Sequence, residues 1–245
     1  MSAPEDPALA KPAEFCCLRG SFLSGEPAGN LKQIGGVDTY VATPDETKSN
    51  GHVLLFFPDA FGLHINNFLT MDAFAACGYL TLGVDYFAGD PIWKHSQSSL
   101  NDPTFDFQSW KHKHMEFTDR IADKWVKDVE AEYGRNGKSI CLRRAWGARF
   151  ACAQLSNDGI CRAGAIAHPS FINESHVFGI DVQAPILFSV PNRDSLFMPE
   201  QRARAVEIMT NENKEFITQI SSPMLHMNLH FQSFIQWFDF WLSTL

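Results

Sequence analysis

The sequence predicts an α/β fold with a mostly parallel central sheet and helices on both of its faces. Short apolar runs alternate along the chain with longer amphipathic stretches, which is the pattern of repeated strand–helix units. One short run, residues 53–57, is apolar at every position, as a central strand buried on both faces requires. Repeated strand–helix units imply right-handed crossovers, which place helices on both faces of the sheet.

The individual elements follow from these patterns. The expected strands are residues 38–42, 53–57, 79–85, 139–142, 164–167, 186–190 and 215–220. The expected helices are residues 67–77, 107–133, 147–157, 199–211 and 230–243. Pro199 fits the first turn of its helix, because a proline lacks the N–H that this position leaves unbonded.

Length and composition predict one globular domain over residues 1–245, with residues 1–30 as an extended N-terminal segment. Apolar residues make up 45% of the chain and charged residues 20%, an ordinary balance for a protein with one large core. Aromatic usage is unusual, with 21 Phe and 6 Trp against 4 Tyr. This excess predicts a dry interior or an apolar pocket.

Charge and motifs exclude several partners and cofactors. A net charge of −8 without a basic stripe argues against a nucleic-acid partner. The chain shows neither a run of about 20 apolar residues nor a signal-like start, so we expect a cytoplasmic protein without a membrane partner. There is no phosphate-binding glycine loop and no metal-ligand spacing, so we expect no cofactor and no metal. The expected partner is a small-molecule substrate, and the expected state a monomer or a homodimer.

One histidine-rich stretch needs a separate interpretation. His112 and His114 alternate with Lys111 and Lys113 in the long expected helix, which suggests a metal or phosphate patch. No acidic or Cys ligand completes a site at that spacing, so we interpret the stretch as a solvated helix face.

Candidate catalytic residues follow the late strands. Active sites of parallel sheets lie at the carboxyl ends of the strands. His168, Asp194 and His226 each follow one of the late expected strands. An Asp after one strand and a His after the next is the chain order of the α/β-hydrolase triad. His168 is either a second proton-transfer group or a loop residue that supports Asp194.

The residue that should precede this pair in the chain is a nucleophile on a sharp turn. That turn should read G-x-nucleophile-x-G after the strand at 139–142, and the sequence there is Arg143-Arg144-Ala145-Trp146-Gly147. Ala145 occupies the nucleophile position, and a methyl group cannot attack a carbonyl. Cys141 and Cys152 should not project where Ala145 does, so neither is expected to replace the nucleophile.

Several motifs spread over nearly the whole chain are specific only when taken together. They are Cys16-Cys17-Leu18, residues 34–44, Pro58-Asp59-Ala60-Phe61-Gly62, Asn66-Asn67, Gly78-Tyr79, Gly89-Asp90, Gly147-Ala148-Arg149-Phe150, His168-Pro169-Ser170-Phe171, Asp194-Ser195-Leu196-Phe197 with Pro199, and His226. With these motifs the chain resembles the dienelactone hydrolase family of α/β-hydrolases, in particular its fungal branch. The resemblance implies the α/β-hydrolase fold.

The resemblance also implies roles for single residues. In that family a Cys thiolate attacks a lactone or enol ester, with a His as its base and an Asp that orients the His. These two roles fall on His226 and Asp194, and the Cys position falls on Ala145. The oxyanion donors implied by the resemblance are the backbone N–H groups of Ala60 and Trp146.

Further residues are expected around the substrate. Phe61 and His168 are expected near it. Arg143 and Arg144 are either ligands for a carboxylate or enolate oxygen or a solvated pair. Part of the aromatic excess falls at strand ends around the expected pocket: Phe61, Phe87, Trp146, Phe171 and Phe197.

Three explanations of the missing Cys remain open. In the first, the protein is a non-hydrolytic enzyme that moves a proton with His226. In the second, it binds a ligand or a partner without catalysis. In the third, another residue replaces the nucleophile and hydrolysis follows an atypical route, or Ala145 was introduced into the sequence. We favour the first, because a base and its orienter are retained. The expected reaction is an isomerisation, dehydration or cyclisation of a small polyketide-like lactone, anhydride or enone in secondary metabolism.

Overall fold

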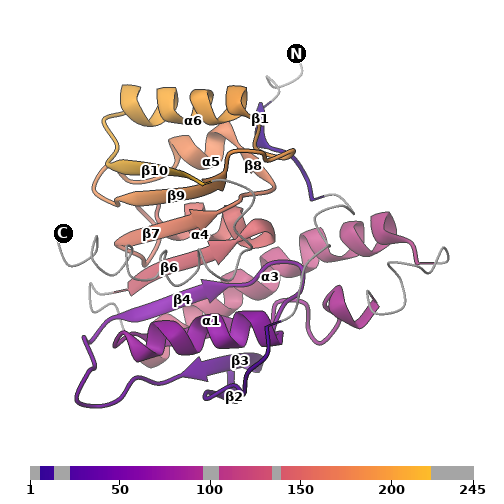
Figure 1. The fold of residues 1–245 in the computed structure, drawn as a ribbon, viewed down its shortest axis with the longest axis vertical. Helices are drawn as coiled ribbons and strands as arrows, with labels where there is room; N and C mark the ends of the chain where they lie inside the picture. The colour runs from indigo at the N-terminus through magenta and orange to yellow at the C-terminus, as the bar shows by residue number, and fades with distance from the viewer. Residues whose placement is uncertain (1–5, 14–22, 96–104, 134–138, 222–245) are drawn as a thin grey trace.

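The computed structural model describes residues 6–13, 23–95, 105–133 and 139–221. Within these ranges an eight-stranded sheet has the order β10-β9-β7-β6-β4-β5-β3-β2 (Figure 1). Its strands are β2 (Asn30–Ile34), β3 (Val37–Ala42), β4 (Val53–Phe57), β5 (Leu80–Val84), β6 (Ser139–Arg144), β7 (Ala163–Ala167), β9 (Ile186–Pro191) and β10 (Phe216–Ser221). The six strands β5, β4, β6, β7, β9 and β10 are parallel to one another, whereas β3 is antiparallel to its neighbours β5 and β2. The predicted mostly parallel α/β sheet is therefore confirmed.

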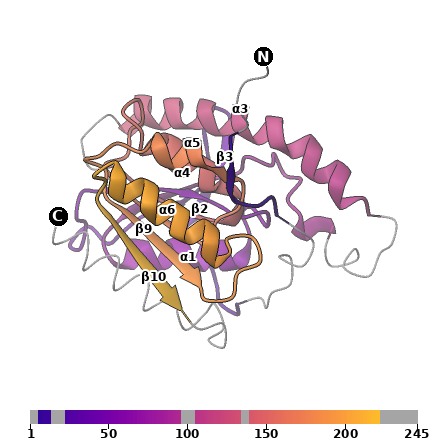
Figure 2. The same cartoon turned by 90° about the horizontal axis from the view of Figure 1, so that it is seen from above.

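Helices cover both faces of the sheet. They are α1 (Ile65–Ala76), α3 (Phe107–Tyr133), α4 (Ala148–Gln154), α5 (Glu174–Phe178) and α6 (Pro199–Asn211). Seen from above, α3 and α4 lie on the face opposite to α1 (Figure 2). The expected helix at residues 230–243 lies outside the described residues.

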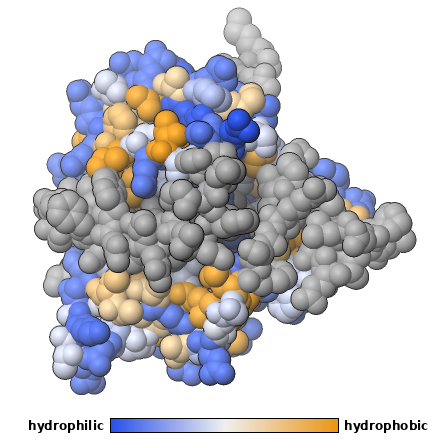
Figure 3. Space-filling view, in the orientation of Figure 1, coloured by the Kyte–Doolittle hydropathy of each residue, from blue (hydrophilic) through white to orange (hydrophobic). Residues whose placement is uncertain are grey.

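A hydrophobic cluster lies on each face of the sheet. The central strand β4 contributes side chains to both clusters, because its side chains alternate between the two faces. Leu55 and Phe57 belong to the larger cluster, which includes Trp125 of α3. Leu54 and Phe56 belong to the smaller cluster against α1. Apolar residues come to the surface beside α1 and β10 (Figure 3), where several hydrophobic side chains of the smaller cluster are only partly buried.

Among the described residues, several short elements were not expected from the sequence, including β1 (Ala8–Ala10), β2, β8 (Ile172–Asn173) and α5. Strand β1 pairs antiparallel with β8 in a separate two-stranded sheet, and α5 follows β8 directly. Strand β2 joins β3 through Gly35 and Gly36, both with positive φ, in a two-residue hairpin. The first four residues of β2 are exposed, so the strand shows no apolar alternation that sequence patterns detect.

The long helix α3 and the C-terminal part of the described chain match expectation more closely. Helices α3 and α6 have the expected bounds, and so does β4. Helix α4 ends earlier than expected, at Gln154, and β6 extends to Arg144. No helix among the described residues is long and apolar enough to cross a membrane.

The turn between β6 and α4 brings the backbone very close to β4. A Cβ added at Gly147 would lie 2.8 Å from the Cβ of Phe57 and 3.1 Å from its carbonyl oxygen. The same added atom would lie 3.2 Å from the hydroxyl of Tyr86, which itself donates to the carbonyl of Pro58. Glycine is therefore required at this position because a side chain would clash with β4. Its backbone conformation is not the reason, since any residue can adopt a φ of −75°.

We expect Gly147→Ala to lower the free energy of unfolding by about 1–3 kcal/mol, because β4 or the turn must shift to admit the methyl group. Denaturant unfolding followed by circular dichroism measures this loss. Gly179→Ala is the control: Gly179 also has an ordinary φ of −70°, and its added Cβ would lie 3.3 Å from the nearest atom, the carbonyl oxygen of Ser175. An equal loss in both variants would contradict the packing explanation.

Candidate active site at the carboxyl edge of the sheet

The carboxyl ends of the parallel strands meet at one edge of the sheet, as expected for an active site of this fold class. Strand β6 pairs with β4 on one side and with β7 on the other, with Phe57 opposite Arg143 and Arg144 opposite Ala167. Ala145 follows directly and begins a 3₁₀ turn (Ala145–Gly147) that leads into α4. This strand–turn–helix geometry places position 145 at the middle of the edge, as the elbow interpretation predicted.

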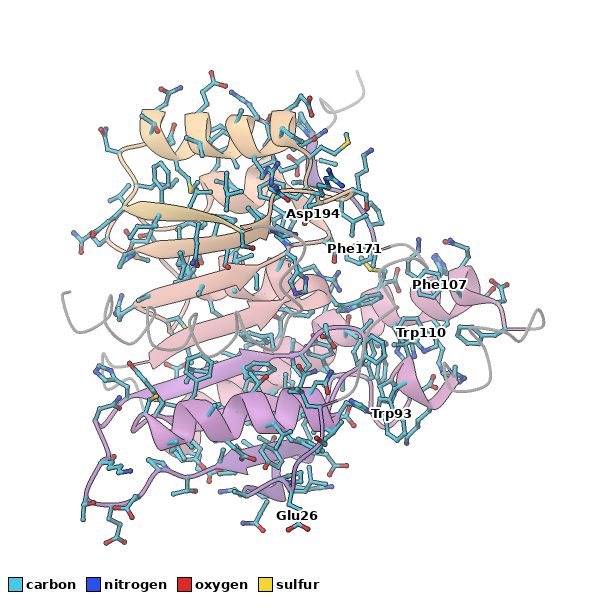
Figure 4. All side chains as sticks on the ribbon, viewed as in Figure 1. Glu26, Trp93, Phe107, Trp110, Phe171 and Asp194 are labelled. Carbon is cyan, nitrogen blue, oxygen red and sulfur yellow. The ribbon has the colours of Figure 1, made fainter. Side chains whose placement is uncertain are left out.

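Figure 4 shows the side chains along this edge. Asp194, Phe171, Trp110 and Trp93 follow one another from the β9 end toward the loop after β5. His226 lies outside the described residues, so its predicted role and position stay predictions.

The side chain of Trp146 packs in the core. Its indole is 0% exposed, and its Nε1–H donates to Thr118 Oγ1 at 3.3 Å. Its ring meets those of Phe87, Trp110 and Phe171 at centroid distances of 5.5, 5.5 and 4.9 Å. The indole is therefore part of the packed core at the strand ends, as is the buried ring of Phe87, and a place beside the expected pocket stays a prediction for both. Phe197 is buried as well, whereas Phe61 and Phe171 are half-buried. The role predicted for the Trp146 backbone N–H is not affected.

Arg149, four residues after Ala145, ties this core to α3. Arg149 is 8% exposed; its Nε donates to Asp119 Oδ1 at 2.8 Å, and its Nη2 forms an ion pair with the same oxygen at 2.7 Å. It also donates to the Met115 carbonyl and to Thr118 Oγ1, at 3.2 and 3.0 Å. Its Cζ lies 5.7 Å from the ring centre of Trp146 and 5.6 Å from that of Phe171, so it holds both rings by cation–π contact as well.

The loop after β4, which contains Ala60, is held by several hydrogen bonds. Asp59 Oδ1 accepts from the Phe61 N–H at 2.9 Å and from Asn67 Nδ2 at 3.2 Å, and the Ala60 carbonyl accepts from the Ile92 N–H at 3.0 Å. Among the described residues, no acceptor is found for the Ala60 N–H. The loop is therefore fixed while this donor stays available.

Asp194 is held in a tight loop after β9. Its Oδ1 accepts from the N–H groups of Leu196 and Phe197 at 2.8 and 3.1 Å, and Oδ2 has no hydrogen bond to any described residue. Buried Arg202 of α6 donates to the carbonyls of Pro191 and Asn192 at 2.7 and 3.2 Å and so fixes the start of the loop. The carboxylate thus keeps one oxygen for a further partner.

The loop at residues 168–171 contains backbone strain. His168 has φ +35° and Phe171 has φ +58°, which are left-handed conformations that favour glycine and cost about 1–3 kcal/mol each. The His168 N–H donates to the Ser189 carbonyl of β9 at 2.9 Å, so this loop lies next to the one that carries Asp194. His168 itself is half-buried. Such strain persists only where the surroundings fix the backbone.

The interpretation of the histidine-rich stretch as a solvated helix face is wrong for His114. Its side chain is 1% exposed, and its Nε2 lies 2.9 Å from Asp90 Oδ2. Asp90 also accepts from Lys113 and His95 at 2.6 and 2.5 Å. Burial lowers the pKa of His114, and the three hydrogen bonds hold the pKa of Asp90 well below its ordinary value although burial opposes them. No group of metal-ligand residues is found in the described part of the chain.

Sequence reasoning therefore named positions at the strand ends, and it listed Asp90 and Arg149 within motifs, but it did not predict the contacts that these residues make. Arg149, Thr118, Asp90 and Arg202 act across long sequence separations, and none has a spacing signal of its own. For Arg149 and Arg202 the one available signal was residue type, since a charged residue within an apolar helical stripe must find a partner when it is buried.

Comparison with known proteins gives one consistent result. The family model for the dienelactone hydrolase family matches residues 37–226. Two curated proteins of Gibberella moniliformis are similar over nearly the whole chain. Dienlactone hydrolase 1 is 53% identical and covers 99% of both chains, and dienlactone hydrolase 2 is 49% identical and covers 97% of this chain and 99% of its own.

A solved structure shares the fold at low identity. Esterase 2 of Thermogutta terrifontis, phosphonylated by sarin, has a TM-score of 0.61 and is 12% identical, covering 90% of this chain and 96% of that chain. Identity this low shows the fold alone.

We expect Arg149→Met to lower the free energy of unfolding by about 2–3 kcal/mol, because it removes the charge-assisted hydrogen bonds to Asp119, Thr118 and the Met115 carbonyl. Chemical denaturation measures the loss. Arg162 is exposed, so Arg162→Met should change the value by no more than about 0.5 kcal/mol. Equal stability of the two variants would disprove the tying role of Arg149.

We also expect the free energy of unfolding to fall as the pH drops from about 7 to 5. The unfolded chain binds a proton at each His near pH 6.5. Folded His114 binds its proton only at lower pH, so acidification favours the unfolded state in this window. Burial likewise lowers the pKa of His64 and His176, which add to the same trend.

Glutamine at position 114 keeps a donor for Asp90 but does not titrate. His114→Gln should therefore make the decline of stability with acidification shallower. The exposed His112 gives the control, because His112→Gln should leave the slope as in the unchanged protein. Urea denaturation at several pH values measures how the free energy of unfolding depends on pH. If this dependence is the same in His114→Gln as in the unchanged protein, His114 is not the group responsible.

Proposed function

The chain belongs to the dienelactone hydrolase family, and we propose that it catalyses a non-hydrolytic acid/base step on a small lactone, anhydride or enone. The step is an isomerisation, dehydration or cyclisation of a largely apolar, polyketide-like molecule of secondary metabolism. The proposal includes His226 as proton-transfer group, Asp194 as its orienter, and the N–H groups of Ala60 and Trp146 as donors to a developing oxyanion.

The observation that carries the proposal is Ala145 at the start of the turn between β6 and α4. Covalent hydrolysis in this family needs a thiolate at that position, and a methyl group supplies neither a nucleophile nor a proton. Proton transfer needs no group there.

The remaining machinery supports proton transfer. Asp194 keeps Oδ2 without a described hydrogen bond, which suits a carboxylate that orients an imidazole. In the proposed step His226 takes a proton from the carbon next to a carbonyl, and the negative charge moves to the carbonyl oxygen. The same His226 then returns the proton to another atom of the ligand, so that atoms and charge balance. Donors that stabilise a tetrahedral oxyanion also stabilise an enolate.

Two alternatives have specific support. The names of the two Gibberella relatives favour hydrolysis of a lactone or ester, here by an atypical route. Loss of the nucleophile also fits a ligand-binding protein without catalysis. A small-molecule substrate without a nucleic-acid or membrane partner, a cytoplasmic location and a monomeric or dimeric state remain predictions.

We expect the protein to convert α-angelica lactone, whose shift to the conjugated isomer only moves a proton, in a reaction that His226→Ala slows at least about a hundredfold. NMR in D₂O follows the product and the deuterium that it takes up. Asp194→Asn should slow the reaction too, because the imidazole loses its orienter.

Hydrolysis provides the opposing measurement. The unchanged protein should not accelerate hydrolysis of 4-nitrophenyl acetate, whereas Ala145→Cys should gain this activity because the remaining machinery is in place. His226-dependent ester hydrolysis by the unchanged protein would favour the hydrolase alternative. Binding of the lactone without either reaction would favour the binding protein.

A further inference from the structure

Residues 6–13 form a strap across the loops of the candidate site, and we call them the N-terminal strap. Its strand β1 pairs with β8, with Ala8 opposite Asn173 and Ala10 opposite Ile172. Leu9 and Ala10 are 2% and 1% exposed. The strap is therefore part of the packed structure at the end of the sheet that carries the site.

The backbone of Lys11 joins two loops that are otherwise separate in sequence. Its N–H donates to the Leu196 carbonyl at 2.9 Å, and its carbonyl accepts from the Phe171 N–H at 3.2 Å. Leu196 lies two residues after Asp194, and its own N–H donates to the Asp194 carboxylate. One residue of the strap thus bridges the loop at 168–171 and the loop at 192–197.

The loop at 168–171 needs such a restraint. Phe171 has φ +58°, a left-handed conformation that a phenylalanine rarely adopts. The Lys11 carbonyl holds its N–H, while Trp146 and Arg149 hold its ring. The strained residue is thus fixed from two sides, by the strap and by the helix that follows the elbow.

We propose that the N-terminal strap is a positioning element of the active site, in which the backbone of Lys11 sets the loop of Phe171 against the loop of Asp194. The catalytic part rests on the proposed function, because it takes Asp194 as the orienter of His226. Lys11 acts through its N–H and carbonyl, and its side chain is exposed. Lys11 is thus a positioning residue, not a catalytic one.

A second anchor holds the other end of the strap. The Asp6 carboxylate accepts from the Ser175 N–H at 3.1 Å and from its hydroxyl at 2.5 Å, and the Pro7 carbonyl accepts from the Glu174 N–H at 2.9 Å. These contacts attach the strap to α5 and not to the loop of Asp194. The two anchors can therefore be loosened separately.

Lys11→Pro tests the bridge, because proline has no N–H to give to Leu196. The change is mild for the backbone, since Pro12 already restricts residue 11 to extended conformations that proline can adopt. Hydrogen exchange measured by mass spectrometry or NMR should become about fivefold to tenfold faster at the amides of Phe171, Leu196 and Phe197.

Two matched controls separate the bridge from general loosening. Lys11→Ala keeps both backbone hydrogen bonds, so these three amides should exchange as in the unchanged protein. Asp6→Ala loosens the anchor at α5 and should speed exchange at Ser175 but not at Leu196 or Phe197. Unchanged exchange at Leu196 and Phe197 in Lys11→Pro would overturn the proposal.

The unchanged protein supplies a measurement that does not depend on any variant folding. If the strap is fixed, the amides of Lys11 and Phe171 exchange together and much more slowly than in a free peptide. Exchange of Lys11 at the free-peptide rate, with a protected core, would overturn the proposal as well.

The effect of the strap on catalysis is measured as hydrolysis of 4-nitrophenyl acetate by the Ala145→Cys variant. Adding Lys11→Pro should lower kcat about tenfold or more and shift the acidic limb of its pH profile, since a displaced Asp194 orients His226 less well. If the strap only stabilises the fold, Lys11→Pro would lower Tm but leave kcat and its pH profile unchanged. If exchange responds as stated but no acid/base or ester activity is found in any variant, the proposed function fails and the positioning of the two loops stands.

Discussion

The close approach of Gly147 to β4 is the constraint on which the candidate site depends. The turn after β6 has room only because residue 147 has no side chain facing Phe57. This contact fixes where α4 begins, and α4 in turn places Arg149 against α3. Position 145 is then held at the middle of the sheet edge whatever side chain it carries. The chain can therefore lack the nucleophile and still keep the frame that surrounds it.

Buried charge stabilises this frame. Arg149 and Arg202 are both largely buried, and burying a guanidinium is costly unless its donors are used. Arg149 uses them on α3, and Arg202 uses them on the two carbonyls before the loop of Asp194. Each arginine thus fixes one loop of the site. The strained conformation of Phe171 indicates that these restraints are strong enough to hold an unfavourable backbone.

The sequence predicted those elements whose pattern is long or apolar on both faces, such as β4 and α3. It could not predict β2, whose exposed side chains show no alternation, or the two-residue strand β8. Asp194 was found because its place after a strand is a signal in itself. His114 was misread because its neighbours in sequence are lysines and another His, whereas its partner Asp90 lies 24 residues away. Contacts between residues this far apart in the sequence produce no local sequence pattern that would predict them.

The type of donor in the oxyanion site explains why proton transfer is compatible with the altered elbow. In the proposed mechanism both donors are backbone N–H groups, and a change of side chain at position 145 removes neither of them. The Ala60 donor depends on the loop that Asp59 fixes, and the Trp146 donor depends on the buried indole held by Thr118 and Arg149. In that proposal an alanine at the elbow removes the covalent step alone. A reaction whose charge develops on a carbonyl oxygen without covalent attack can still use everything that remains.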